Sequence, residues 1–134
     1  MSMPVKVIVS AVALLSAAVF FLVDTIPPRS LTGTRMFVTM RRILQFAHGH
    51  NKLPPTLAEL PPMPGYDTET TDAWGRPLDY SVDDAGVVIL RSLGADGHPG
   101  GDGENEDMTA SFTSRDSQGR WESFLSAKKD FPAL

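Results

Sequence analysis

The chain has 134 residues, a length that fits one domain, and a formal net charge of −4 at pH 7. It contains no cysteine, which excludes a disulfide framework and fits either side of a membrane. The acidic balance, without a basic stripe interleaved with aromatic residues, excludes nucleic acid as an expected partner.

The N-terminal segment differs in composition from the rest of the chain. Residues 7–23 carry no charge, and a helix of this length would extend about 26 Å, the short end of what spans a bilayer. We therefore expect residues 1–26 to form a transmembrane anchor, with residues 7–23 in the membrane. Two alternatives stay open: a buried core helix, and a cleaved signal peptide with Lys6 as its charged region.

The charges around the apolar run do not settle the orientation of the anchor. Lys6 precedes the run, and four arginines at positions 29, 35, 41 and 42 follow it closely. By the positive-inside count alone, the domain could even face the cytoplasm.

A second helix is predicted after the proline pair. Pro27-Pro28 should end the membrane helix, and residues 27–33 should form a linker. The helix is expected to begin near Thr34 and to end at Gly49 in the left-handed conformation. Its apolar face would consist of Met36, Phe37, Met40, Ile43, Leu44 and Ala47, with Arg35, Arg42 and Gln45 on the other side.

The segment after this helix is predicted to be mostly irregular. His48 and His50 flank Gly49 and are interpreted as structural groups at the helix end. Thr56 and Glu59 have the spacing of a capping box around a one-turn helix. Residues 65–73 are polar and are expected to be exposed.

A β-hairpin is predicted in the second half of the chain. Residues 78–82 alternate between apolar and polar, residues 84–86 have turn character, and residues 87–90 are apolar throughout. Residues 108–112 and 120–125 are each expected to add a strand.

The segment 93–107 has the composition of a cation-binding loop. It holds five carboxylates and five glycines, with no lysine or arginine. Calcium prefers about six to eight oxygen ligands from carboxylates and backbone carbonyls. Glycines let the backbone curl so that its carbonyls converge. A solvated acidic turn is the alternative.

Two other interpretations of the loop are disfavoured. With Asp96 as its first position, an EF-hand would need acidic groups at the third and fifth positions, where His98 and Gly100 stand. A catalytic metal held by Asp96, His98, Asp102 and Asp107 is conceivable. However, the chain has no cysteine, no Gly-x-Ser-x-Gly elbow and no His-Glu-x-x-His pair. We therefore expect neither an enzyme nor a small-molecule substrate.

Two ordered motifs resemble a known family. They are Asp72-Ala73-Trp74-Gly75-Arg76-Pro77, and Ser92-Leu93-Gly94-Ala95-Asp96-Gly97 followed by Glu106-Asp107 before Met108. This combination resembles the C-terminal domain of the major pseudopilin of type II secretion systems, a general secretion pathway protein G, over about residues 34–112. The resemblance implies an α+β domain at 34–134, with a pilin-like helix packed on a small antiparallel β-sheet.

The same resemblance implies a calcium (Ca²⁺) site in the loop. Carried over by position, Asp96 and Asp107 would be side-chain ligands. Leu93 and His98 would give backbone carbonyls, and Glu106 would be a further ligand.

The function implied is structural. The chain would be a subunit of a type II secretion or type IV pilus-like assembly, single-pass in the bacterial inner membrane, with its C-terminal domain in the periplasm. Its partners would be other pilin-like or secretion-system subunits. The N-terminus departs from the family, because residues 1–32 contain neither the cleavage glycine nor the glutamate five residues beyond it. The alternative is a free-standing, membrane-tethered calcium-binding module that recognises another partner.

Overall fold

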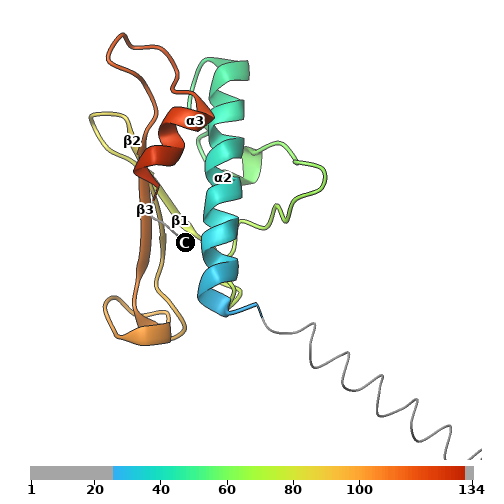
Figure 1. The fold of residues 1–134 in the computed structure, drawn as a ribbon, viewed down its shortest axis with the longest axis vertical. Helices are drawn as coiled ribbons and strands as arrows, with labels where there is room; N and C mark the ends of the chain where they lie inside the picture. Colours follow the sequence, from blue (N-terminus) through green and yellow to red (C-terminus); the bar gives the residue numbers. More distant parts are fainter. Residues whose placement is uncertain (1–25, 132–134) are drawn as a thin grey trace, which may run out of the picture.

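A computed structural model describes residues 26–131 of the chain. It shows one long helix beside a three-stranded antiparallel sheet, which confirms the predicted α+β class (Figure 1). The predicted anchor, apart from residue 26, lies outside the described residues. Within residues 26–131, no helix combines the length and hydropathy needed to cross a bilayer. The elements are α2 (Pro28–His50), η1 (Leu57–Glu59), β1 (Asp79–Val82), β2 (Val87–Ser92), η2 (Gly103–Asn105), β3 (Met108–Thr113), α3 (Phe124–Ala127) and η3 (Lys128–Asp130).

Helix α2 begins earlier than predicted. Its first residue is Pro28, so residues 28–33 are helical and the expected start near Thr34 was wrong. Proline is compatible with the first turn of a helix, because the amide it lacks would have no intrahelical partner there. The Leu31 amide donates to the Pro27 carbonyl at 3.0 Å and closes this turn.

The end of α2 also differs from the prediction. Gly49 is helical, and the left-handed residue is Asn51, with φ of 54°. Asparagine tolerates this conformation better than other residues with a side chain. The His50 ring stacks on Phe46 at 4.1 Å between centroids and supports the last turn of the helix. His48 Nε2 lies 3.1 Å from the Glu122 carbonyl oxygen, in keeping with a structural role for both histidines.

The sheet confirms the predicted hairpin and the predicted strand near 108–112. β2 lies in the centre and pairs antiparallel with both β1 and β3. Gly86 has φ of +79° in the turn between β1 and β2, a conformation that glycine adopts without steric cost. Leu90 pairs with Tyr80 on one side and Ala110 on the other, so the inward faces of the three strands align.

The core lies between α2 and the sheet. From the helix it takes Met36, Met40 and Ile43, and from the sheet it takes alternate residues of β2 and β3. The buried apolar residues of the strands are Val88, Leu90, Ala110 and Phe112. This pattern places the loop 93–107 at one end of the sheet, beside the start of α2 (Figure 1).

The middle of the chain between α2 and β1 lies on the other side of the helix from the sheet (Figure 1). It contains the predicted short turn as η1, but Thr56 makes no side-chain capping bond, so the capping box was wrong. Arg42 was expected on an outer face and is instead 5% exposed. It donates to the carbonyl oxygens of Leu60, Pro61 and Thr68 at 2.7–3.1 Å and anchors this irregular segment. Burial lowers the pKa of the Arg42 guanidinium.

The predicted strand at 120–125 is absent from the described chain. Trp121 forms a single bridge with Arg115, and residues 124–127 are the short helix α3. Ser123 caps this helix, since its side chain accepts from the Ser126 amide at 3.2 Å.

Candidate functional site

The two sequence motifs meet at the buried carboxylate of Asp72. This side chain is 1% exposed, against the expectation that residues 65–73 are exposed. Its Oδ1 accepts from the amides of Trp74 and Arg76 at 3.0 and 2.9 Å. Its Oδ2 accepts from the Ser92 hydroxyl at 2.8 Å. Asp72, the first residue of the first motif, therefore binds its own turn and also Ser92, the first residue of the second motif. We call these contacts the Asp72 junction.

Arg76 extends this junction into the loop. Its Nη1 and Nη2 donate to the carbonyl oxygens of Gly94 and Ala95 at 2.8 and 3.0 Å. The guanidinium lies against Gly97, where an added Cβ would come within 2.5 Å of Arg76 Nε. The close approach of Arg76 accounts for glycine at position 97.

The loop backbone folds over itself at two glycines. Gly94 and Gly101 both have positive φ, and a Cβ on either would lie 2.7 Å from the Asn105 carbonyl oxygen. The Ala95 amide donates to the Glu104 carbonyl at 2.8 Å and joins the two sides of the loop. Glycine at these positions allows backbone segments to approach closely.

The first turns of α2 contact both the Asp72 junction and the loop. Arg29 Nη1 donates to the carbonyl oxygens of Gly103 and Glu106 at 3.1 and 2.6 Å. The Ala73 amide donates to the Thr32 hydroxyl at 3.0 Å. Because these contacts join residues more than 40 positions apart in the chain, they fix the loop relative to the helix.

Among the predicted calcium ligands, Asp107 has the most side-chain contacts. Its Oδ2 lies 2.6 Å from Arg91 Nη2, and its Oδ1 accepts from the Gly100 amide at 3.1 Å. The hydrogen bond from Arg91 holds the pKa of the Asp107 carboxyl below its usual range. The carboxylate is therefore ionised at neutral pH, as a metal ligand must be.

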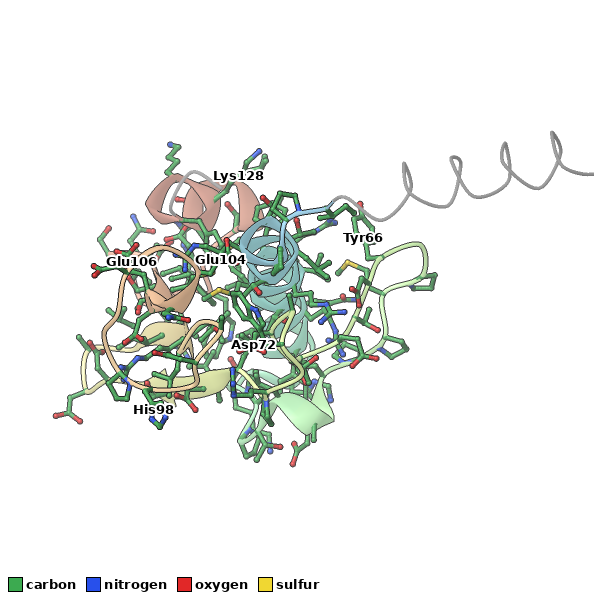
Figure 2. All side chains as sticks on the ribbon, turned by 90° about the horizontal axis from the view of Figure 1, so that it is seen from below. Tyr66, Asp72, His98, Glu104, Glu106 and Lys128 are labelled. Carbon is green, nitrogen blue, oxygen red and sulfur yellow. The ribbon has the colours of Figure 1, made fainter. Side chains whose placement is uncertain are left out.

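The other predicted ligands are spread along the loop. Asp96 and His98 are exposed, and the Asp96 carboxylate accepts from the His98 amide at 3.0 Å. Figure 2 shows His98 at the outer edge of the loop, well apart from Glu106. None of the loop contacts described above uses the backbone oxygen of Leu93 or His98.

The donor chemistry of the loop fits a hard cation, although its acidic side chains do not converge. Within residues 26–131, no three histidine, aspartate or glutamate side chains lie together as a metal site. Coordination by Asp96 and Asp107 would have to be completed by backbone oxygens such as those of Leu93 and His98, which calcium accepts readily.

Comparison with known families decides between the interpretations of the motifs. Residues 56–111 match the family model of type II secretion system protein G. Over these residues, the chain is similar to a pseudopilin. The match includes the Asp72 junction, the hairpin and the whole loop, and it confirms the resemblance predicted from the motifs. The comparison with curated proteins gave no match.

The family that residues 56–111 match is structural, and the match supports a pseudopilin-like subunit of a secretion system. The sequence did not predict that three arginines outside the loop contact it, namely Arg29, Arg76 and Arg91. The available signal was a loop with five carboxylates and no lysine or arginine of its own, which favours positive charge supplied from elsewhere.

Proposed function

We propose that this chain is a structural subunit of a type II secretion or type IV pilus-like assembly. It would be held in the bacterial inner membrane by residues 7–23, with the α+β domain in the periplasm. The family match over residues 56–111 carries the proposal, and the Asp72 junction gives the matched motifs a physical role.

The described contacts suit a rigid structural domain rather than a catalytic one. Arg29 and Thr32 bind the loop and the junction to the first turns of α2, close to the predicted anchor. The loop is thus fixed relative to the first turns of α2, which follow the predicted anchor in the sequence. Such rigidity helps a subunit present one surface repeatedly in an assembly.

Exposed apolar side chains offer contact points for neighbouring subunits. Ile26 is 67% exposed and Leu125 is 75% exposed, at the start of the described chain and on α3. We expect a photo-crosslinking residue placed at either position in the native membrane to capture other pilin-like or secretion-system subunits. The crosslinked products would be identified by mass spectrometry.

The exposed Lys52, beyond the end of α2, provides a comparison position. Capture of secretion subunits from Ile26 or Leu125 above the level at Lys52 would support the proposal. Capture of only unrelated envelope proteins from all three positions would instead favour the membrane-tethered calcium-binding module, an alternative suggested by the absence of glycine and glutamate from residues 1–32.

We further propose that calcium stabilises the loop 93–107. Asp96 and Asp107 would provide carboxylate oxygens, Leu93 and His98 backbone oxygens, and Glu106 a further ligand. The ion would neutralise part of a segment whose own residues are acidic and would join the two ends of the loop.

Removal of calcium should therefore destabilise the full-length chain in detergent. With free calcium about 100-fold above the Kd, the ion should add roughly 2.7 kcal/mol to the free energy of unfolding. Thermal denaturation in chelator and in calcium measures this difference. Asp96→Ala or Asp107→Ala should abolish the response to calcium.

Asp116→Ala is the matched control for these variants. Asp116 also pairs with an arginine, Arg120, at 2.8 Å, but it lies in the loop at the opposite end of β3 (Figure 1). The control should keep the full calcium response. Equal melting of the unsubstituted chain in chelator and in calcium would exclude a stabilising calcium ion.

A further inference from the structure

Arg91 forms an ion pair with Asp107, one of the carboxylates proposed to bind calcium. Its Nη2 lies 2.6 Å from Asp107 Oδ2, and the two side chains are 38% and 21% exposed. Arg91 is held in β2 opposite Thr109 of β3, so its backbone is fixed close to the strand that Asp107 precedes. The pair is therefore positioned by the sheet rather than by the loop alone.

The three arginines that reach the loop have different acceptors. Arg29 and Arg76 donate to backbone carbonyl oxygens. In the described part of the chain, the ion pair made by the loop is the one between Arg91 and Asp107. Arg91 is accordingly the arginine whose position conflicts with a metal ion.

Both oxygens of Asp107 already have partners, since the Gly100 amide donates to Oδ1. A divalent ion at this carboxylate would repel a guanidinium held 2.6 Å from the same group. Because the Arg91 side chain is long and partly exposed, it can turn into solvent without leaving a buried charge behind.

We propose that Arg91 is a built-in counter-cation of Asp107 that calcium must displace. Arg91 would hold the loop closed when calcium is scarce, and calcium would replace it when calcium is abundant. This inference rests on the proposed calcium site. It predicts that the chain binds calcium more weakly than its loop would without Arg91, and that loss of calcium leaves the loop closed rather than open.

Calorimetric titration of the full-length chain in detergent with calcium tests the proposal. Arg91→Gln should lower the Kd for calcium about threefold or more, because the competing ion pair is removed. Arg120→Gln is the matched control: it removes the same charge from an arginine–aspartate pair far from the loop, and its Kd should equal that of the unsubstituted chain. Arg91→Lys keeps the charge without the planar guanidinium and should have an intermediate Kd.

Thermal denaturation provides a second measurement. In chelator, Arg91→Gln should melt below Arg120→Gln, and saturating calcium should reduce or reverse that difference. Equal calcium Kd values for the unsubstituted chain and Arg91→Gln, or a higher Kd for Arg91→Gln, would overturn the inference and leave the calcium site intact. The absence of calcium binding in every variant would overturn the site and the inference together, whereas binding by Arg91→Gln alone would show that Arg91 excludes calcium and would overturn the proposal that calcium replaces it.

Discussion

Replacement of Asp72 by alanine is expected to lower the free energy of unfolding by about 3–5 kcal/mol, as measured by urea denaturation of the full-length chain in detergent. The carboxylate accepts three hydrogen bonds at 2.8–3.0 Å while 1% exposed. Alanine would leave the amides of Trp74 and Arg76 and the Ser92 hydroxyl without this acceptor. Unsatisfied buried donors cost more than the hydrogen bonds themselves contribute.

Two further variants distinguish the effect of burial from the effect of turn geometry on the free energy of unfolding. Asp83 accepts from the Ala85 and Val87 amides in the exposed β1–β2 turn, so Asp83→Ala should cost about 1 kcal/mol or less. Asp72→Asn keeps one acceptor oxygen and replaces the other with an NH2 group that can only donate to Ser92. Its loss of unfolding free energy should therefore be intermediate. Equal losses for Asp72→Ala and Asp83→Ala would contradict the role assigned to the junction.

Arg42→Met should also destabilise the domain strongly, by about 2–4 kcal/mol in the same urea titration. Methionine fills similar space and removes the cost of burying a charge, which offsets part of the loss. It cannot donate to the carbonyl oxygens of Leu60, Pro61 and Thr68. The irregular segment between α2 and β1 would then be held less firmly on the helix.

The neighbouring Arg41 is the control for this substitution. It is half-buried, with a 3.2 Å contact to the Tyr66 hydroxyl and its guanidinium over the Phe124 ring. Arg41→Met should cost less than 1 kcal/mol, since these contacts reach solvent. If Arg42→Met were no more destabilising than Arg41→Met, the three carbonyl contacts would not anchor the segment.

The hairpin could be predicted because its signals are local. Alternation in residues 78–82, turn chemistry around Gly86 and the apolar run of β2 act within a few residues of one another. The strand near 108–112 was also recoverable, since its alternation has the same period of two. For residues 120–125, by contrast, pairing ends after one bridge at Trp121, and the Ser123 cap starts a helix instead.

The errors on the helix and the junction come from tertiary contacts. Periodicity placed Arg42 opposite the apolar face, but a second layer of irregular chain covers that side of α2 and supplies carbonyl acceptors. Asp72 is polar and was expected to be exposed, yet Ser92, twenty positions later, gives it a buried partner. Neither partner is visible in the local pattern of residues.

The composition of the sequence located the loop, but it did not predict which arginines contact it. Acid and glycine content predicts that residues 93–107 bind a cation. It does not specify whether the charge comes from a metal ion or from arginines elsewhere in the chain. Arg29 and Arg76 lie outside this segment, and sequence distance hides their contacts with its carbonyls. The calcium ligands remain a prediction from the resemblance.

The most direct test of a calcium-stabilised, pseudopilin-like domain is a crystal structure of the full-length chain grown in millimolar calcium, with anomalous scattering used to locate the metal. We expect one calcium ion bound by Asp96, Asp107 and the backbone oxygens of Leu93 and His98, with Arg91 turned away from Asp107. A loop without an anomalous peak, and with Arg91 still on Asp107, would contradict it.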